Sequence, residues 1–480
     1  MEEFNEENPS EVDYLKSEIF NKKNSVVNDK DFDAKNYSVG IISLGCDKNR
    51  VDTETMLSYL RDAGYTFTSE MEDADILIVN TCAFIASARD EAVSTIEEMC
   101  EYRTDENAKC TRLIVTGCLP QKCPEELEKV FPEVDIILGI DEYPNISEII
   151  HKSYLTDRRI VKIGSADTIY HAKNRVVTTN FNYAYIKIAD GCNNYCTFCT
   201  IPQIRGRYRS RTIEDVFEEA NDLVNNGATE LILVAQDISR FGTDRSDKSQ
   251  IIELIQKLST IENLKWIRLL YCYPEMLTNE LLNEMMTNPK LCKYLDVPLQ
   301  HISDGVLKRM NRKTTKANIE EFVQKVKNLP EFVSVRTTLM TGFPGETEDD
   351  FNELCEFLNS ARLLNVGFFA YSKEEGTPAA NLPNQVDEQV KQKRLLKLMK
   401  LQEKIAKEEN KKFIGKVVEV CCEGVDYDKQ MFYGRCQYQA PDVDSIVFFK
   451  SKEPICQGEY YKVKIKGVTG YDLKGEVIYE

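Results

Sequence analysis

Short, almost wholly apolar runs alternate with amphipathic runs in the first part of the chain. The apolar runs have the length and composition of strands that are buried on both faces of a sheet. Strands are predicted at 39–46, 75–82, 111–118 and 134–139. Strands that alternate with helices are typical of a parallel α/β sheet. We therefore expect an N-terminal α/β domain over residues 38–145, after an acidic and flexible extension at residues 1–37.

A second alternating series begins near residue 181. Six more strands are predicted, with amphipathic helices between them, at 184–192, 230–237, 265–274, 294–300, 334–345 and 365–372. Six such units predict a partial barrel of the TIM type, (β/α)6, over residues 181–411, with a long charged helix at its end. Residues 146–180 have no clear pattern, and we expect them to connect the two domains.

The pattern changes to short alternating strands and turns after residue 411. Residues 412–480 hold four or five such strands, which predict a small β-barrel of the OB-like kind. The fold class is therefore α/β with a small all-β domain at the C-terminus. A length of 480 residues agrees with several domains rather than one.

Charge narrows the classes of partner. The chain has 61 Lys and Arg against 79 Asp and Glu, a net charge of −18. This charge disfavours partners bound through a phosphate backbone and favours a basic protein. No apolar run reaches the roughly 18 residues of a membrane span, and the N-terminus has no apolar leader. We expect a cytoplasmic enzyme with no membrane partner.

Sixteen cysteines in a chain expected to be cytoplasmic do not suggest a disulfide framework. Ten of them lie among apolar or mixed residues without metal spacing, and we expect these to be small buried core residues. They are Cys100, Cys110, Cys123, Cys272, Cys292, Cys355, Cys421, Cys422, Cys436 and Cys456.

The strongest chemical signal is a C-x3-C-x2-C motif formed by Cys192, Cys196 and Cys199 directly after a predicted strand. A 4Fe-4S cube normally takes four thiolates, so three would leave one iron open to a substrate. A zinc knuckle is the alternative, but it needs a fourth Cys or His nearby. The forty residues after Cys199 contain neither. We therefore favour an iron–sulfur cluster.

A second set of three cysteines is spread along the N-terminal domain. Cys82 lies 36 residues after Cys46, Cys118 lies 36 residues after Cys82, and each closes a predicted strand. The carboxyl ends of parallel strands meet at one edge of a sheet, so the three thiols are expected to converge there. Three converging thiols again describe a cluster with one open iron. Buried cysteines at strand ends are the plainer alternative.

These motifs resemble those of the radical S-adenosylmethionine (SAM) enzymes. Within that superfamily, SLGCDKNRVDTE, NTCAFI and VTGCLPQK, followed by a C-terminal β-barrel, are similar to the methylthiotransferases, whose barrel is called TRAM. The resemblance covers residues 38–480. The segments SLGCDKN, IPQIRGRYRSR, LLYCYPE, PLQHISD, YSKEEGTPAANLP and YGRCQYQAPDVD resemble the branch that modifies a ribosomal-protein aspartate, the RimO type.

The chain departs from that branch at two places. Asp47 stands where the branch usually has proline, and residues 1–37 have no counterpart. The tRNA-adenosine branch instead shows a TYGCQMN-like first motif and VPYTRG after its cluster. Residues 412–480 carry nine Lys and one Arg against eleven Asp and Glu, a net charge of −1. A barrel that binds tRNA would be expected to be basic, so we expect no direct tRNA substrate.

The resemblance implies a reaction and its cofactors: two 4Fe-4S clusters and SAM. One SAM would methylate a sulfur at the auxiliary cluster held by Cys46, Cys82 and Cys118. A second SAM, on the cluster of Cys192, Cys196 and Cys199, would be cleaved to a 5′-deoxyadenosyl radical. The radical would take hydrogen from the β-carbon of an aspartate in a small-subunit ribosomal protein, which then receives the methylthio group. A flavodoxin- or ferredoxin-like electron donor and a sulfur source are implied as further partners.

The same resemblance suggests residues that bind SAM. Gln236 and Asp237, at the end of the second barrel strand, are candidates for its polar groups. Gly342, Gly345 and Glu348 in TGFPGETE are candidates for backing the adenine. A tight strand-to-helix turn with an N-terminal cap explains TGFPGETE equally well.

Five basic residues have two interpretations each. Four arginines alternate along residues 205–211. They belong either to a solvated strand or loop, or to a strip that binds carboxylates beside the cluster. They are Arg205, Arg207, Arg209 and Arg211. His301 is either a core histidine or a contact for SAM or substrate.

Two other functions are weighed against the ribosomal-protein enzyme. The first is a tRNA adenosine methylthiotransferase with the same clusters. The second is a non-catalytic iron–sulfur or zinc protein whose barrel binds RNA. Reductive cleavage of SAM separates the enzymes from the second.

Overall fold

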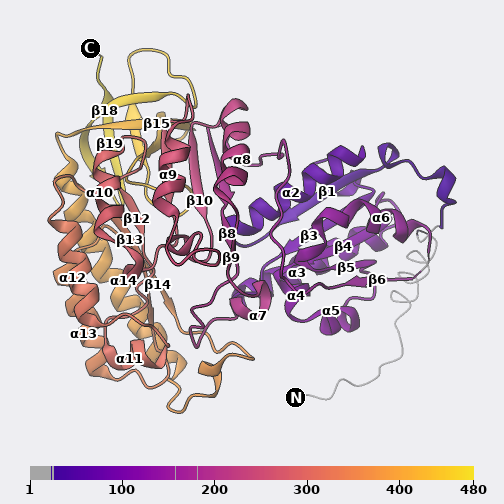
Figure 1. Ribbon diagram of the computed structural model, residues 1–480, viewed down its shortest axis with the longest axis horizontal. Coiled ribbons are helices and arrows are strands. Elements are labelled where there is room, and N and C mark those ends of the chain that lie inside the picture. Colours follow the sequence, from indigo (N-terminus) through magenta and orange to yellow (C-terminus); the bar gives the residue numbers. More distant parts are fainter. Residues whose placement is uncertain (1–22, 24–25, 157, 181, 480) are drawn as a thin grey trace. The chain divides into compact units, whose positions relative to one another are not determined.

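The computed structural model describes residues 23, 26–156, 158–180 and 182–479 (Figure 1). These residues form two compact units. Unit 1 extends to Thr178 and also includes Ile201–Arg207, whereas unit 2 contains Thr179–Thr200 and the chain from Tyr208 onward. Within the described part of the chain, no helix is long and apolar enough to cross a membrane. Of the extension expected at residues 1–37, residues 1–22, 24 and 25 lie outside the described residues.

Unit 1 is built on a six-stranded sheet in which every neighbouring pair of strands is parallel. In spatial order the strands are β2 (Thr66–Phe67), β1 (Ser38–Ser43), β3 (Ile76–Thr81), β4 (Arg112–Gly117), β5 (Ile136–Leu138) and β6 (Ile160–Lys162). The central strands β3 and β4 are buried along their whole length, as their apolar sequences predict.

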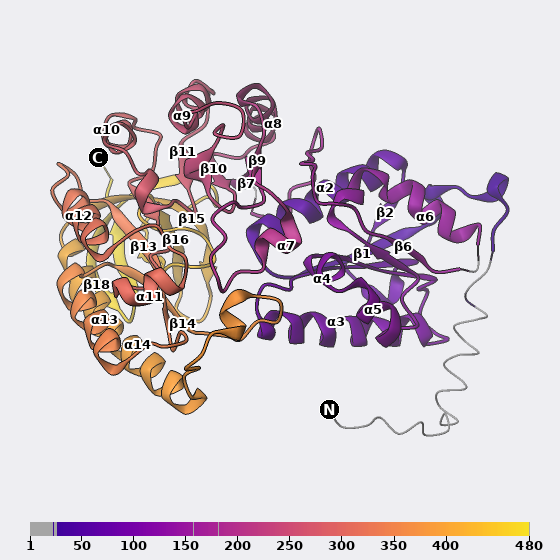
Figure 2. The same ribbon diagram turned by 60° about the horizontal axis from the view of Figure 1, so that its bottom comes forward.

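Helices cover both faces of this sheet (Figure 2). Helices α2 (Asp47–Ala63) and α6 (Ile146–Tyr154) pack on one face, through residues such as Met56 and Ile150. The other face carries α3 (Ala86–Thr104), α4 (Cys118–Lys122) and α5 (Pro124–Val130), and its core also contains Ile204 of α7 (Ile201–Arg205). The expected α/β domain is confirmed.

Two segments flanking this domain differ from expectation. Residues 146–180 were expected only to connect domains, yet they contribute α6 and β6 to unit 1. Strand β6 is three residues long and lies at an edge, mostly exposed, so it has no apolar pattern to reveal it. Residues 27–37 are not a loose extension either. The Val27 amide donates to the Tyr154 carbonyl at 2.8 Å, and the Phe32 and Tyr37 rings pack against Tyr154.

Unit 2 begins with two three-stranded parallel sheets. Their strands are β11 (Trp266–Leu269), β10 (Glu230–Val234) and β7 (Tyr183–Lys187), then β12 (Tyr294–Asp296), β13 (Ser334–Thr341) and β14 (Asn365–Ala370). Backbone hydrogen bonds join β11 to the chain before β12: Ile267 donates to Lys290 at 2.7 Å and Cys292 donates to Ile267 at 2.9 Å. The six strands thus form one curved series, the expected partial barrel.

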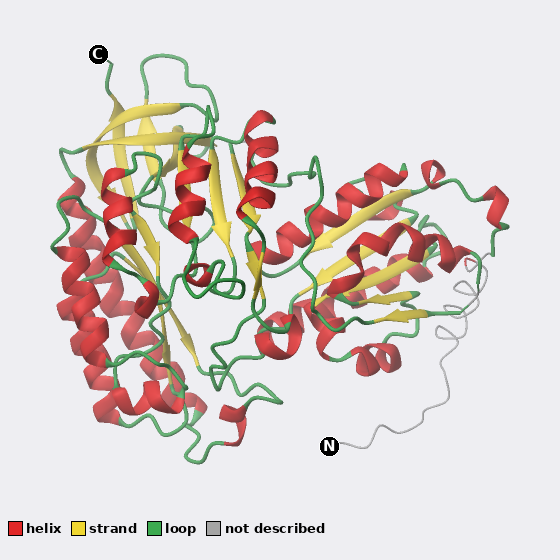
Figure 3. Ribbon diagram, in the orientation of Figure 1, coloured by secondary structure: helices red, strands yellow, loops and turns green. Residues whose placement is uncertain are grey.

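Helices accompany these strands (Figure 3). They are α8 (Ile213–Asn225), α9 (Ile251–Ser259), α10 (Asn279–Thr287), α11 (Asp304–Arg309), α12 (Lys316–Lys327), α13 (Glu348–Ala361) and α14 (Glu388–Asn410). A short antiparallel pair, β8 (Ala189–Asp190) and β9 (Arg209–Ser210), flanks the cysteine motif. Short 3-10 turns are η1 (Asp29–Asp31), η2 (Ala34–Asn36), η3 (Met71–Asp73), η4 (Ile140–Asn145), η5 (Ile238–Arg240), η6 (Pro274–Met276), η7 (Pro378–Asn381) and η8 (Lys411–Phe413).

The chain ends in a closed five-stranded barrel. Its strands are β15 (Val417–Asp426), β16 (Met431–Cys436), β17 (Val447–Lys450), β19 (Asp472–Val477) and β18 (Tyr460–Thr469), in that order around the barrel. The alternating residues Val418 and Val420, with Val463 and Ile465, fill its interior. The predicted small β-barrel is confirmed, and its closure leaves no unpaired sheet edge.

A buried group of charges ties this barrel to the partial barrel within unit 2. Arg435 of β16 lies 2.8 Å from Glu230 of β10 and 2.6 Å from Glu423 of β15, measured between nitrogen and oxygen. Arg268 of β11 contacts the other Glu230 oxygen at 2.6 Å. All four side chains are at least nine-tenths buried. Removing one of these charges would leave another buried without its partner, which is strongly destabilising.

Two three-cysteine sites and the relatives of the chain

The first site is the loop 192–199, which follows β8 in unit 2. Cys192 and Cys196 are each 7% exposed, and Cys199 is half-buried. Thr197 anchors the loop: its amide donates to the Met310 carbonyl at 3.1 Å, and its hydroxyl donates to the Arg309 carbonyl at 2.8 Å. The loop is therefore anchored to the carboxyl-terminal end of α11.

Basic and acidic groups surround these thiols. Burial raises the pKa of Cys192 to about 11, and the neighbouring Cys196 and Asp237 add to that shift. The Arg312 guanidinium lies 3.9 Å from the Cys196 sulfur and over the Tyr273 ring at 4.4 Å, so it places a positive charge beside this thiol. Sequence reasoning did not single out Arg312, since it has no spacing relation to the cysteines.

The proposed SAM contacts of the second barrel strand lie beside this loop. Asp237 is fully buried and accepts hydrogen bonds from Asn194 at 3.1 Å and Arg240 at 2.9 Å. Burial raises its pKa, although its hydrogen-bond donors oppose the shift. Gln236 donates to Asp190 at 2.9 Å, while its own amide oxygen is buried and has no hydrogen-bond partner among the described residues. Both residues thus present polar groups near the cysteine loop.

The TGFPGETE segment is a strand-to-helix turn. Gly342 and Gly345 both have positive φ, at 76° and 77°, and Lys391 fills the space beside Gly342. Glu348 begins α13, where its side chain is 67% exposed and lies 3.0 Å from Arg394. Glu348 therefore points to solvent rather than into the fold.

Glu346, which sequence reasoning passed over, is the carboxylate that organises this turn. It accepts from the Gly342 amide at 2.7 Å, from the Thr341 hydroxyl at 3.0 Å and from Arg394 at 2.7 Å. His301 is fully buried, with its Nε2 atom 3.6 Å from the same carboxylate. The core interpretation of His301 describes its surroundings better than an open contact does.

The second site lies in unit 1 at the carboxyl edge of β1, β3 and β4. Cys46 immediately precedes α2, Cys82 follows β3, and Cys118 opens α4. Burial raises the pKa of Cys118 to about 11; Arg205 opposes this, and the neighbouring Cys46 and Cys82 thiols add to it. The three thiols are thus close enough to influence one another, as their 36-residue spacing predicts.

Backbone conformation makes room between these thiols. Gly45 has a φ of 88°, and a Cβ atom there would lie 2.7 Å from the Cys82 Cβ and 3.0 Å from its sulfur. Gly117 has a φ of 97°, and its missing side chain avoids the Asn80 amide and the Thr81 backbone. These glycines let strand ends turn sharply at the site.

Asn49 and Arg205 complete the second site. The fully buried Asn49 donates to the carbonyl oxygens of Leu44 at 3.1 Å and Thr81 at 2.9 Å. Its amide oxygen faces the Cys118 sulfur at 3.6 Å and accepts from Arg205 at 2.5 Å. Asn49 lies in the SLGCDKN segment, but nothing in the sequence alone gave it a contact with Cys118.

The four alternating arginines differ in their partners and in their exposure. Arg205 is buried beside Asp52 at 2.6 Å, and Arg211 pairs with Asp215 at 2.6 Å and with Glu219. Arg209 lies 4.0 Å from Asp190, whereas Arg207 is exposed. Three of the four therefore contact carboxylates of this chain itself. The interpretation as a solvated strand or loop does not describe these three.

None of the 16 cysteines forms a disulfide. Of the ten expected in the core, Cys456 is exposed and Cys100, Cys123 and Cys355 are half-buried, so the expectation is wrong for Cys456. In the described residues, no three His, Cys, Asp or Glu side chains are grouped as ligands of a single metal ion. A four-iron cluster does not need that grouping, because each thiolate binds a different iron atom.

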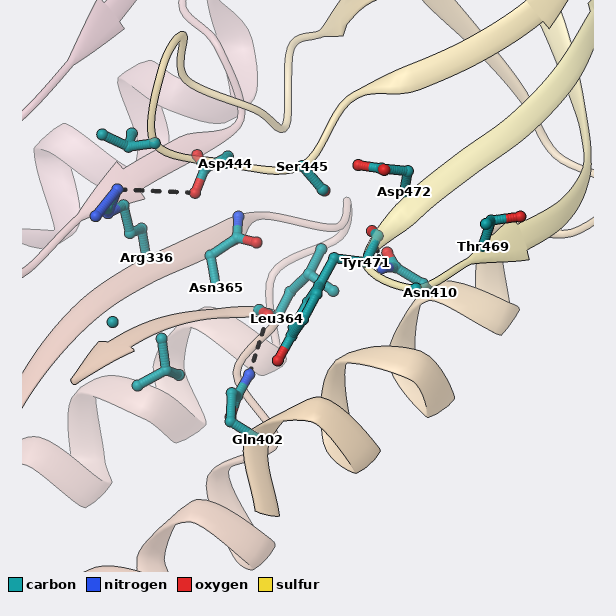
Figure 4. Close-up of a pocket in the computed structure, with 14 residues that line it drawn as sticks. Arg336, Leu364, Asn365, Gln402, Asn410, Asp444, Ser445, Thr469, Tyr471 and Asp472 are labelled. Atoms are coloured by element: carbon teal, nitrogen blue, oxygen red, sulfur yellow. Dashed lines mark hydrogen bonds and ion pairs between the residues drawn. The ribbon is translucent and has the colours of Figure 1, made fainter. Parts of the chain in front are cut away.

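Unit 2 also contains a hollow of about 580 Å³ between the partial barrel and the C-terminal barrel (Figure 4). Arg336, Asn365 and Gln402 line one side, and Asp444 and Asp472 line the other. Asn365 is the first residue of β14, so the hollow lies at the amino ends of the parallel strands. The loop 192–199 follows the opposite ends, and the hollow is separate from the cysteine site.

Family models match three parts of the chain. Residues 38–139 match "Uncharacterized protein family UPF0004", residues 186–358 match the radical SAM superfamily, and residues 414–478 match the TRAM domain. Among solved structures, the radical S-adenosylmethionine methyltransferase TsrM from Kitasatospora setae superposes with a TM-score of 0.52 at 13% identity. The match covers 71% of this chain and 73% of that one. This likeness concerns the fold alone.

The partial barrel and its C-x3-C-x2-C loop define a radical SAM enzyme. Relatives from Clostridium botulinum (strain Eklund 17B) and Caldicellulosiruptor saccharolyticus are each 46% identical over 443 residues. These alignments cover 92% of this chain and 98% or 99% of the relative, and both relatives are named ribosomal protein uS12 methylthiotransferase RimO. The chain belongs to the RimO family of methylthiotransferases.

Proposed function

We propose that this enzyme attaches a methylthio group to the β-carbon of an aspartate in the small-subunit ribosomal protein uS12, in the cytoplasm. The observation that carries the proposal is the 46% identity, over 92% of this chain, to enzymes named for that substrate. The presence of one three-cysteine site in each unit supports it, because sulfur insertion and radical formation are separate tasks.

The loop of Cys192, Cys196 and Cys199 is proposed to hold a 4Fe-4S cluster whose open iron binds SAM. Bound together, cluster and SAM supply the one-electron chemistry that generates a carbon radical. The residues of the chain position the ligands: Thr197 fixes the loop, Arg312 lies against the Cys196 sulfur, and buried Asp237 offers a carboxylate next to Asn194. Gln236 offers a buried amide oxygen that has no partner within the described residues.

A second 4Fe-4S cluster is proposed at Cys46, Cys82 and Cys118. The site fits such a group, since two of the thiols are buried, Gly45 leaves space beside Cys82, and Asn49 and Arg205 supply polar contacts. An open iron there would hold the sulfur that is transferred. A flavodoxin- or ferredoxin-like electron donor and a sulfur source complete the proposed partners.

Charge supports a protein substrate. The C-terminal barrel segment 412–480 has a net charge of −1, within a chain of −18. A basic ribosomal protein is attracted to such a surface, whereas the phosphate backbone of tRNA is not. The tRNA-modifying alternative therefore becomes an outcome of the test rather than a second proposal.

The test uses the full chain, reconstituted anaerobically with iron and sulfide and supplied with SAM and a reductant. One reaction receives uS12 and a parallel one receives unmodified tRNA, and mass spectrometry of both looks for an added methylthio group. We expect it on an aspartate of uS12 and not on tRNA. A modified adenosine with unmodified uS12 would overturn the proposal in favour of the tRNA branch. The matched control replaces Cys46, Cys82 and Cys118 with Ala and should modify neither substrate.

A further inference from the structure

A buried arginine contacts one thiol of the auxiliary site. Arg205 is the last residue of the short helix α7, which packs within unit 1 although it begins two residues after Cys199. Its Nη2 atom lies 3.4 Å from the Cys118 sulfur and 2.5 Å from the Asn49 amide oxygen. Its Nη1 atom lies 2.6 Å from Asp52.

Burying the positive charge of Arg205 costs free energy unless neighbouring groups compensate it. The side chains of Arg205 and Asp52 are 2% and 3% exposed. Asp52 compensates one edge of the guanidinium, and the other edge faces the sulfur and the Asn49 oxygen. Because an arginine fork keeps its charge at all working pH values, it presents a permanent positive charge to the ligand sulfur.

The effect of that charge depends on the charge of the group that the thiols hold. Reduction by one electron makes an iron–sulfur cluster more negative, and a nearby cation stabilises the more negative state. Hydrogen bonds to ligand sulfurs act in the same direction. A cation at 3.4 Å from Cys118 therefore favours the reduced form of a cluster at this site.

We infer that Arg205 is a positioning residue of the auxiliary site, which orients Cys118 together with Asn49 and raises the reduction potential of the cluster held there. The inference rests on the second cluster of the proposed function. It also gives a reason for the path of the chain: one continuous segment supplies the last ligand of the first site, Cys199, and the charge that adjusts the second.

The experiment isolates the auxiliary cluster. In a background in which Cys192, Cys196 and Cys199 are Ala, the reconstituted full chain is titrated electrochemically while its visible absorption and electron paramagnetic resonance are recorded. Arg205→Gln should retain about four irons and shift the one-electron reduction equilibrium at least tenfold toward the oxidised form, which is 59 mV. Arg205→Lys keeps a positive charge, so its reduction potential should stay close to that of the parent background. Arg207 is exposed, and Arg207→Gln is the matched control, which should change neither the iron content nor the reduction potential.

A second variant keeps the inference testable if Arg205→Gln fails to bind iron. Asp52→Asn removes the compensating negative charge and should shift the equilibrium in the opposite direction, toward the reduced form. The inference is overturned if Arg205→Gln keeps its iron with an unchanged potential, or if Asp52→Asn shifts the potential downward or leaves it unchanged. Absence of iron from the parent background would instead refute the second cluster itself, and with it this part of the proposed function.

Discussion

Single residues decide how close the strand ends of unit 1 approach one another, and Gly45 is the clearest case. Its φ of 88° strains any other residue by about 1–3 kcal/mol. In addition, a Cβ atom at residue 45 would lie 3.0 Å from the Cys82 sulfur and crowd this thiol, which is proposed to bind the cluster. We predict that Gly45→Ala, on the background lacking Cys192, Cys196 and Cys199, loses most of its bound iron, as measured by iron content after reconstitution.

Gly64→Ala separates backbone strain from crowding at the thiol. Gly64 lies in the same unit with a φ of 103°, but a Cβ atom there meets only the flexible Lys35 side chain, at 3.3 Å. This control should lower the unfolding temperature and keep its iron. Equal iron contents in both variants would show that Gly45 does not serve the site.

At the residue scale, the cysteines were predictable and their neighbours were not. The 36-residue repeat is a property of strand–helix–strand units, so the sequence alone places Cys46, Cys82 and Cys118 at one edge. Arg205, Arg312 and Glu346 reach their sites from other elements, and Asn49 lies on α2 three residues after Cys46. No periodicity relates these four residues to the cysteines. Their contacts depend on tertiary packing, which one sequence does not display.

At the element scale, the buried charges between β10, β11, β15 and β16 give a prediction with a definite pH dependence. Burial alone would raise the pKa of Glu230, but Arg268 and Arg435 outweigh it, and the pKa is lowered. Ionised Glu230 therefore stabilises the fold above the unfolded pKa, about 4.3. This contribution is lost as the pH falls through the lower folded pKa.

Glu230→Gln should accordingly destabilise unit 2 by about 3–5 kcal/mol at pH 7, because Arg268 and Arg435 are left with too little compensating charge. Its free energy of unfolding should also depend less on pH below about 4.3 than that of the parent chain. Urea unfolding at several pH values measures both effects. Glu419→Gln is the control: Glu419 pairs with Lys265 at the surface, and its loss should cost no more than about 0.5 kcal/mol. Similar losses for both variants would contradict the assigned role of the buried group.

Elements with strong patterns were found from the sequence, and short ones were missed. The strands β3, β4 and β10 are buried runs of apolar residues, and this pattern predicts them directly from the sequence. Strand β6 has three residues and α7 has five, too few to show a period. The membership of α7 in unit 1 is a further property that local sequence does not contain, because it depends on Ile204 packing into a distant core.

At the scale of the whole molecule, two units each carry one set of three cysteines, and this division predicts that two activities can be lost separately. Cys82→Ala alters unit 1 alone and should retain reductive cleavage of SAM to 5′-deoxyadenosine while abolishing methylthiolation of uS12. Cys192→Ala alters the loop of unit 2 and should abolish both, because cleavage would require the open iron of the cluster proposed at that loop. Both products are measured by mass spectrometry in the same anaerobic reaction.

Cysteine variants outside the two sites supply the controls for that comparison. Half-buried Cys100 in α3 of unit 1 and exposed Cys456 in unit 2 belong to neither set, so Cys100→Ala and Cys456→Ala should keep both activities. If Cys192→Ala still forms 5′-deoxyadenosine at the parent rate, the loop 192–199 is not the SAM site. If Cys82→Ala loses SAM cleavage as completely as Cys192→Ala, the two sets do not act separately, and the assignment of one task to each unit is wrong. Retention of SAM cleavage with loss of the methylthio product, in Cys82→Ala alone, is the result that a division of labour between the units requires.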